Sequence, residues 1–392
     1  MANNFTLKEV RNAKDVKKFL EFPAELYKDD KNWIRPLDKE IEKVFDPEKN
    51  KMFRTGEAIR WIAIDSKGNT AGRIAAFYEK KTAAKNEQPT GGIGFFECIN
   101  NSVAANTLFD AAKKWLSEKG MEAMDGPVNF GDRDNFWGCL KEGVYEPVYN
   151  MPYNFAYYNE LFENYGFKEY FKQYTYHMDL SAGVKSDVVR QKAKRLNKDK
   201  GYIFETLNRK VIDRYAEDFT VIFNKAWAKF PGVKPVKKAH AKALLDSLKP
   251  VIDPRTVLFG YYRGEPIAFF IMIPDLNPVI KSFNGKMNII NKIRLFTGLK
   301  ILKKSKRLIG LIFGVVPEQQ GKGVESALIT RFEQETVKKD FPFTDLEMNW
   351  IGDFNKSMMK LVEQIGGKIR KTHITYRYLF DREKPFSRAK NI

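Results

Sequence analysis

The sequence predicts an α/β protein of mixed α+β type, in which two tandem halves each hold a central mixed sheet flanked by helices. Each half shows the same order of elements, with an antiparallel hairpin followed by a strand, a helix, a second helix and a last strand. Equivalent features also recur at a nearly constant offset. Asn154 and Asn355 lie 201 residues apart, and Gly166 and Gly366 lie 200 residues apart. This regularity indicates a degenerate tandem duplication.

The first half, placed at residues 1–182, opens with two apolar runs around the turn-forming segment 66–69. Its long insertion is Gly126–Met151, and the segment Gly126–Gly131 within it is rich in turn formers and is a candidate for lining an acceptor cleft. The other expected elements are the strands Ile62–Asp65, Gly72–Phe77, Gly92–Ile99 and Tyr170–Leu180 and the helices Ala104–Lys119 and Asn154–Asn164.

The second half, placed at residues 183–392, contains a hairpin that turns at Arg263–Glu265, and Pro317 stops its third strand. The paired glycines 366 and 367 end its last helix, since glycine adopts the left-handed cap easily. The expected elements are the strands Thr256–Tyr262, Pro266–Ile273, Leu308–Val316, Thr344–Trp350 and Lys371–Phe380 and the helices Val324–Lys338 and Asn355–Gln364.

Composition excludes several classes of protein. The chain is 43% hydrophobic and 14% aromatic, which suits folded domains. Its two cysteines and three scattered histidines form no disulfide framework and no metal-ligand spacing, so we expect no metal and a reducing, cytoplasmic setting. The first 18 residues are polar and show no signal pattern, and no apolar run approaches the roughly 18 to 20 residues of a membrane span.

The net charge of +19 is unevenly distributed. Residues 276–317 contain no acidic side chain and nine basic ones, and residues 276–307 form an insertion between two strands. Such a single-sign block predicts an anionic partner. Apolar residues alternate with the lysines here, so Lys281–Arg307 is predicted to contact an anionic membrane surface. A basic rim that serves the phosphates of a ligand, or plain packing, is the alternative.

The loop that carries the predicted chemistry is Gln320-Gly321-Lys322-Gly323, between a buried strand and a helix. The first amides of a helix lack intrahelical partners and favour an anion, and glycine lets a phosphate approach the main chain. The spacing does not fit a P-loop, because six residues separate Gly314 from Gly321. A Rossmann fingerprint fails as well, since Ser326 stands where its last glycine belongs.

This loop, the strand before it and the later Asn355-x-x-Met358 segment resemble the pyrophosphate motif and the second motif of the GNAT acyltransferase superfamily. The resemblance implies a sheet that is splayed at its centre, with acyl-CoA in the splay and an oxyanion hole near Val315. The corresponding loop of the first half, residues 100–103, has no glycine pair, so that half is expected to be a non-catalytic copy. The residues expected to bind acyl-CoA are Phe313, Gly314, Val315, Gln320, Gly321, Lys322, Gly323, Val324, Glu325 and Asn355.

Transfer of an acyl group to an amine needs a base for the ammonium proton. Glu347, on the strand beside the loop, is the first candidate, and Asp275, at the end of the hairpin, is the second. The sequence departs from the superfamily pattern at two positions. Glu325 stands where a small residue is usual, and Val362 stands where many members carry a tyrosine acid.

The tandem arrangement, the segment Pro274–Asn277, the basic insertion and the segment Glu347–Trp350 together resemble bacterial ceramide synthase-type N-acyltransferases. This resemblance implies a long-chain, sphingoid-like amine acceptor and a peripheral location on the inner face of the membrane. Two other readings stay open: an acetyltransferase for a small soluble amine, and a tandem GNAT aminoacyl transferase that uses tRNA. Nucleic acid is not an expected binding partner, because the sequence shows no zinc-ligand spacing, recognition helix or aromatic platform.

Overall fold

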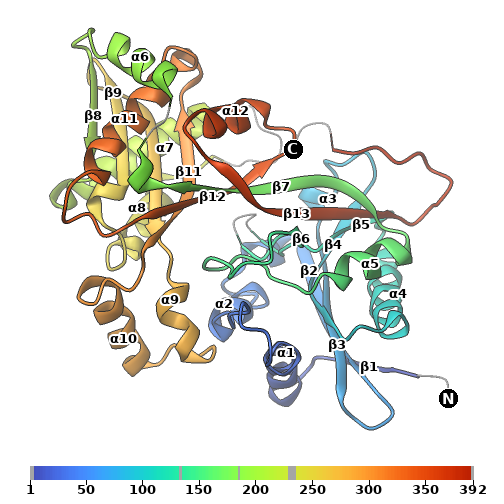
Figure 1. The fold of residues 1–392 in the computed structure, drawn as a ribbon. Helices are drawn as coiled ribbons and strands as arrows, with labels where there is room; N and C mark the ends of the chain where they lie inside the picture. Colours follow the sequence, from blue (N-terminus) through green and yellow to red (C-terminus); the bar gives the residue numbers. More distant parts are fainter. Residues whose placement is uncertain (1–3, 132–134, 184–185, 228–234, 390–392) are drawn as a thin grey trace.

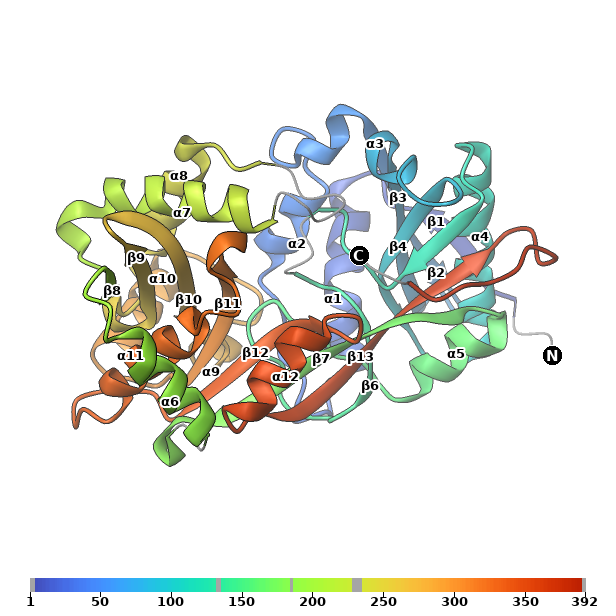
Figure 2. The ribbon, with the colours of Figure 1, turned by 90° about the horizontal axis from the view of Figure 1, so that it is seen from above.

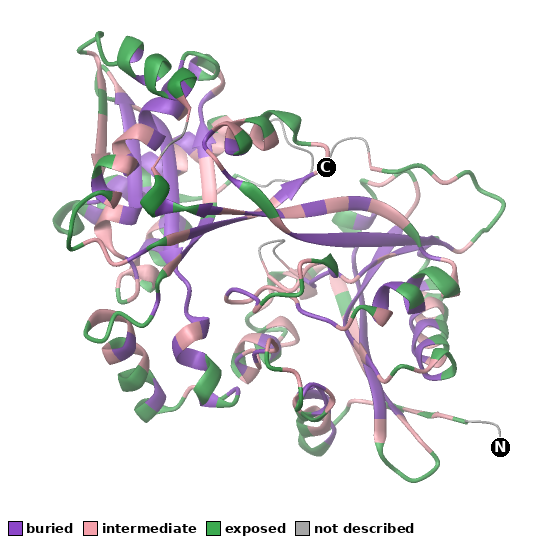
Figure 3. Cartoon of the chain, viewed as in Figure 1, coloured by how far each residue is buried: buried purple, intermediate pink, exposed green. Residues whose placement is uncertain are grey.

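The computed structural model describes residues 4–131, 135–183, 186–227 and 235–389. Within these residues a single 13-stranded mixed sheet runs through the whole molecule, with helices packed against it in each half (Figure 1). Buried residues follow the strands, and exposed residues lie on the outer faces of the helices (Figure 3). The predicted fold class is confirmed.

The strands and helices follow the predicted order. Those of the first half are β1 (Thr6–Glu9), α1 (Ala13–Leu26), α2 (Asp38–Val44), β2 (Gly56–Ile64), β3 (Thr70–Glu79), α3 (Lys80–Ala83), β4 (Thr90–Cys98), α4 (Ser102–Glu118), β5 (Ala123–Gly126), β6 (Cys139–Glu142), α5 (Tyr157–Tyr165) and β7 (Lys168–Asp179). Those of the second half are α6 (Asp187–Leu196), β8 (Tyr202–Thr206), α7 (Ile212–Trp227), α8 (Lys238–Leu248), β9 (Val257–Tyr262), β10 (Glu265–Pro274), α9 (Asn277–Ile280), α10 (Ile289–Lys300), β11 (Arg307–Val315), α11 (Val324–Thr336), β12 (Asp345–Gly352), α12 (Lys356–Gln364) and β13 (Lys368–Leu379).

The last strands of the two halves exchange places in the sheet. Its central order is β5-β13-β7-β12, so β13 pairs with β5 of the first half while β7 pairs with β12 of the second. Figure 2 shows β7 and β13 as two long strands that run between the halves. Arg377 on β13 binds Asp125 on β5 with an Nε–Oδ1 distance of 2.6 Å. The division at residues 182 and 183 therefore follows the chain and not the sheet, and it remains a proposal.

One predicted helix begins later than expected. The first-half helix was expected from Asn154, but α5 begins at Tyr157. The side chain of Asn154 accepts a hydrogen bond from the Leu140 amide at 2.6 Å and donates to the Leu140 carbonyl at 3.1 Å. Asn154 thus anchors β6 instead of starting a helix. Its counterpart Asn355 does cap a helix, because its side chain accepts from the Met358 amide at 3.2 Å.

The exchange of strands places part of β13 in the first hydrophobic core. Phe162 on α5 has no exposed surface, and its ring stacks on Tyr376 of β13 with the centroids 5.3 Å apart. Phe96 and Phe109 pack on the same phenylalanine, with centroid distances of 5.3 and 5.0 Å. The core of the first half therefore depends on the last strand of the chain.

Phe162→Ala is expected to lower the free energy of unfolding by about 3–5 kcal/mol, since it leaves a cavity among these rings. Because β13 joins both halves, the two halves should lose stability together. Urea unfolding followed by circular dichroism measures the loss, and hydrogen exchange of β9 and β10 shows whether the second half follows. Val103→Ala, at an exposed position on α4, is the control. Unchanged protection of β9 and β10 would contradict this coupling.

Candidate active site

The loop between β11 and α11 presents a row of backbone amides that have no partner. Gly321 and Gly323 adopt φ values of +73° and +101°, and Gly323 is the N-cap of α11 with no side-chain cap. Within the part of the chain that the structure describes, the amides of residues 321–326 make no hydrogen bond of normal geometry. These amides lie at the positive end of the helix dipole, so the loop is suited to bind an anion.

Neighbouring strands hold this loop in place. The Gln320 side chain donates from Nε2 to the Val315 carbonyl at 3.0 Å, so it closes the turn and leaves only its backbone for a ligand. Gln319 accepts a hydrogen bond from the Tyr202 hydroxyl of β8 at 2.9 Å. Lys322 is exposed, whereas Glu325 is half-buried in the first turn of α11. The anion-binding conformation is thus fixed before any ligand arrives.

The first half lacks such a row of free amides. At the corresponding helix start, the Asn101 side chain accepts hydrogen bonds from the amides of Val103 and Ala104 at 2.9 and 3.0 Å. A side chain therefore occupies the position that an anion would take. This contrast supports the expectation that the first half is a non-catalytic copy.

The strands β11 and β12 separate after a short paired stretch. They pair in parallel only from Arg307–Asp345 to Gly310–Met348. Beyond that point each strand is irregular. The register of β11 shifts by one residue at Leu311, and β12 is irregular before Ile351. A wedge therefore opens along the second half of β11.

The residues Phe313, Gly314 and Val315 line the open side of β11. They pair with β10 on the other side, where Gly314 lies opposite Phe269 and Val315 lies opposite Ala268. Within the described residues β12 does not pair with them. The wedge leads from Gly310 to the loop at residues 320–323, and at its end the Val315 carbonyl is already engaged by the Gln320 side chain.

Glu347 lies at the closed end of the wedge, opposite Ile309. Its side chain is fully buried and meets three cations. Lys371 approaches its carboxylate to 3.0 Å, and Arg307 and Arg370 each approach to 3.3 Å. Burial lowers the pKa of Lys371, although the neighbouring carboxylate opposes that shift. Glu347 therefore acts first as the counter-ion of a buried cationic cluster.

Asp275 lies close to this cluster at the end of β10. Its Oδ1 accepts hydrogen bonds from the amides of Tyr149 and Asn277 at 3.0 and 3.1 Å, and its own amide donates to the Arg307 carbonyl at 2.9 Å. Burial raises the pKa of Asp275 to about 6. A carboxylate with such a pKa gives up and accepts protons near neutral pH, as a general base must.

Sequence reasoning missed the residues that the first half contributes. The Lys371 ammonium donates to the Glu146 carbonyl at 2.9 Å, and Tyr149 binds Asp275. Near the β12 irregularity, the Trp350 indole donates to the Met151 sulfur at 3.2 Å and its ring packs edge-on against Trp137. The segment expected to line a cleft, residues 126–131, contains none of these residues.

Val362 stands where many superfamily members carry a tyrosine acid. It is buried in the hydrophobic core of the second half, and its side chain can donate no proton. Asn355 is exposed at the start of α12, and its side-chain oxygen is engaged in capping that helix.

Among the described residues, no group of three histidine, cysteine or carboxylate side chains is arranged to hold a metal. The helices in the described ranges include none with the length and apolarity of a membrane span.

Comparison with known proteins gives one informative relative in sequence. The chain is 27% identical over 372 residues to the bacterial ceramide synthase of Caulobacter vibrioides, and the match covers 94% of this chain and 95% of the relative. No family model matches.

Two solved structures show the same fold. A tandem GNAT protein from the clavulanic acid biosynthesis pathway superposes with a TM-score of 0.55 at 10% identity, covering 97% of this chain and 99% of that protein. The GCN5-related glucosamine N-acetyltransferase region of a fungal β-N-acetylglucosaminidase gives a TM-score of 0.55 at 12% identity, covering 96% of this chain but 38% of that one. The chain therefore has the tandem GNAT fold, and along most of its length it resembles a bacterial ceramide synthase.

Proposed function

We propose that this protein is an N-acyltransferase that moves an acyl group from acyl-CoA to the primary amine of a long-chain lipid. The observation that carries the proposal is the row of unpaired amides at residues 321–326, at the end of a strand that separates from its neighbour. The similarity to a bacterial ceramide synthase supports the same reaction class.

The loop supplies the binding site for the pyrophosphate of acyl-CoA in this proposal. The amides of residues 321–326 would donate to the phosphate oxygens, and exposed Lys322 adds a positive charge beside them. The pantetheine arm would then lie along β11 on the side where, among the described residues, β12 does not pair with Phe313, Gly314 and Val315. Asn355, at the start of α12, is the remaining proposed contact.

The reaction needs an oxyanion donor and a proton acceptor. A strand amide on the open side of β11, nearer to Gly310, would donate to the thioester oxygen as negative charge develops on it. An amide at Val315 would lie eight residues along β11 from Arg307, whose carbonyl accepts from the Asp275 amide, and so roughly 26 Å from the proposed base. The amine nitrogen forms the new bond to the acyl carbon, the bond to sulfur breaks, and the thiolate takes up a proton as CoA leaves. We assign to Asp275 the role of accepting the proton from the amine. We assign to Glu347 the role of the counter-ion that keeps Arg307, Arg370 and Lys371 in place.

The chemical class of the acceptor is the most detailed part of the proposal. A long-chain, sphingoid-like amine resides in a membrane, so the enzyme would work at a membrane surface on its cytoplasmic side. The basic window from Lys281 to Arg307 is the part of the chain that we assign to that contact. An acetyltransferase for a soluble amine would have no use for such a window.

Gly323→Asp is expected to weaken the binding of CoA at least about tenfold relative to Gly323→Asn. Both replacements have the same size and both tolerate positive φ better than most residues, but only aspartate places a negative charge at the helix start. Calorimetric titration with CoA, palmitoyl-CoA and acetyl-CoA measures the effect.

Three outcomes of this titration are informative. Equal affinity of the two variants would remove the loop from the binding site. Tighter binding of acetyl-CoA than of palmitoyl-CoA would favour a small-amine acetyltransferase. If palmitoyl-CoA binds more tightly, turnover with sphinganine as acceptor, followed by mass spectrometry of the amide, tests the acceptor class directly.

The rate of acyl transfer should rise with pH through about 6 and then level off, because Asp275 must be ionised to accept a proton. Asp275→Asn keeps an oxygen for both amide hydrogen bonds but should lower kcat/KM at least about a hundredfold and remove this limb of the profile. Stability changes in the opposite direction. Since folding raises this pKa from 3.8, the contribution of Asp275 to stability falls as pH rises from about 4 to about 6. An unaltered pH profile in Asp275→Asn would exclude it as the base.

Glu347→Gln is expected to lower the free energy of unfolding by about 3–5 kcal/mol, because it leaves three cations around a neutral amide. The exposed pair of Glu122 and Lys384 gives the control, and Glu122→Gln should cost less than about 1 kcal/mol. Chemical denaturation measures both variants. If turnover falls in Glu347→Gln while stability is unchanged, Glu347 and not Asp275 carries the proton.

A further inference from the structure

The insertion between β10 and β11 carries an exposed apolar face. Sixteen large hydrophobic side chains of the described residues are exposed, and six of them lie between residues 289 and 302. Figure 3 shows α10 as a largely exposed helix at the edge of the molecule. The exposed fractions are 76% for Ile289, 67% for Ile290, 59% for Ile293, 54% for Phe296, 67% for Ile301 and 61% for Leu302.

The packing of α10 fixes which face points outward. Its inner face rests on α9, where Gly298 is so close to Val279 that an added Cβ would lie 2.8 Å from a methyl carbon. Asn291 is buried on the same inner face, and its side chain donates to the Lys286 carbonyl at 2.9 Å. At roughly 100° per residue, Ile289, Ile293 and Phe296 fall within about 60° on the outer face. An ordinary surface helix turns its apolar face toward the core, whereas α10 turns its apolar face outward.

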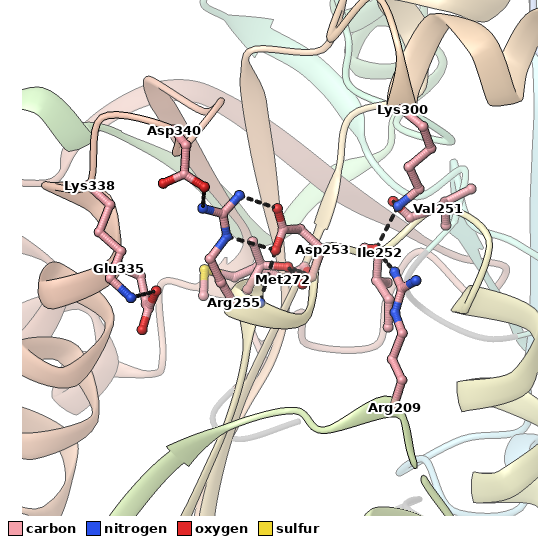
Figure 4. A network of polar contacts seen from close by, with 11 residues as sticks. Arg209, Val251, Ile252, Asp253, Arg255, Met272, Lys300, Glu335, Lys338 and Asp340 are labelled. Atoms are coloured by element: carbon pink, nitrogen blue, oxygen red, sulfur yellow. Dashed lines mark hydrogen bonds and ion pairs between the residues drawn. The ribbon is translucent and has the colours of Figure 1, made fainter. Parts of the chain in front are cut away.

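Lys300 is the one basic residue that the sequence places on this apolar face, and the structure turns it away. Its Nζ donates to the carbonyls of Ile252 at 2.8 Å and Val251 at 3.3 Å, as Figure 4 shows. Arg209 also donates to the Ile252 carbonyl, at 2.7 Å. The end of α10 is thereby tied to the second half, and the apolar face continues without a charge into Ile301 and Leu302.

Cations surround the apolar face and lack anions of their own. Among the described residues no carboxylate lies within 4.0 Å of Lys292, Lys303, Lys304 or Lys306, and all four are exposed. Residues 276–317 hold no acidic side chain. A shallow hollow beside the first turn of α10 is lined by Lys39, Met287, Asn288, Ile289, Ile290 and Lys292. Apolar and cationic groups thus meet on one surface.

We propose that α10 lies in the plane of an anionic lipid bilayer, with its apolar face among the acyl chains and the exposed Lys292, Lys303 and Lys304 at the lipid phosphates. Nucleic acid would use the lysines but leave the isoleucines in water. A bilayer interface uses both, since apolar burial and attraction to anionic headgroups act together there. The assignment of this surface to a bilayer rests on the exposed apolar face and the lysines around it.

The position of the insertion also orients the molecule. It begins after Asp275 and ends at Arg307, so both ends of the insertion meet the charged cluster around Glu347. The anion-binding loop follows the other end of β11, nine residues and roughly 30 Å away. If the proposed function holds, the lipid amine would enter from the bilayer near the cluster, while the CoA phosphates stay in water.

Flotation of the full-length protein with vesicles tests the surface without any acyl-CoA. Wild type should bind vesicles of phosphatidylcholine and phosphatidylglycerol at least tenfold more tightly than vesicles of phosphatidylcholine alone. The triple variant Ile289→Ser, Ile293→Ser, Phe296→Ser and the triple variant Lys292→Gln, Lys303→Gln, Lys304→Gln should each lose at least tenfold. The matched controls are Val103→Ser, Val188→Ser, Ile203→Ser for the apolar set and Lys14→Gln, Lys31→Gln, Lys85→Gln for the basic set. Both controls should bind like wild type.

A tryptophan added at position 296 keeps the test independent of folding losses. Because the chain has six tryptophans of its own, the emission of Phe296→Trp is compared with that of wild type. The added emission should shift to shorter wavelength on anionic vesicles and be quenched by brominated acyl chains. Absence of binding, equal binding by the apolar variant, or dimerisation through this face without vesicle binding would each overturn the proposal. So would tighter binding to a short RNA with no quenching by lipid. Loss of CoA binding with vesicle binding intact would instead refute the proposed reaction and leave the surface in place.

Discussion

The placement of β13 between β5 and β7 is the constraint on which the candidate site depends. It brings Arg370 and Lys371 from the last strand to Glu347 on β12. It also ties the segment 146–149 of the first half to Asp275 and Lys371 in the second. Without this exchange the two halves would each close their own sheet. The second half would then lack the backbone groups that surround Asp275 and Glu347.

The sequence allowed the elements to be predicted, because periodicity and turn residues are local properties. Both hairpins, the strand before the glycine loop and α11 lie where the patterns indicated, and the offset between the halves anticipated two similar units. The start of α5 was wrong by three residues, since Asn154 binds the backbone of β6 and no local pattern records that contact. The exchange of β7 and β13 was not predictable either. Two similar strands can trade places without any change in their own periodicity.

The candidate site likewise contains one part that the sequence allows to be predicted and another part that it does not. The free amides of residues 321–326 follow from the glycines and from the missing side-chain cap, and both can be read from a short segment. The environments of Glu347 and Asp275 depend on strands that are remote in the chain. Strand alternation made Glu347 a candidate for the splay, and it gave no sign of three cations within 3.3 Å. A carboxylate surrounded in this way serves as the counter-ion of the three cations.

The charge distribution links the wedge to the insertion. Arg307 closes the basic window and also contacts Glu347, so the cationic cluster inside the protein continues into the cationic surface around α10. Inside, each cation has a carboxylate or a carbonyl as its partner, because a buried charge requires one. Around α10 no carboxylate of the described residues lies within 4.0 Å of Lys292, Lys303, Lys304 or Lys306, and the isoleucines beside them are exposed at a cost in free energy. A surface that retains both features in the free protein is best explained by a partner that is apolar and anionic at once.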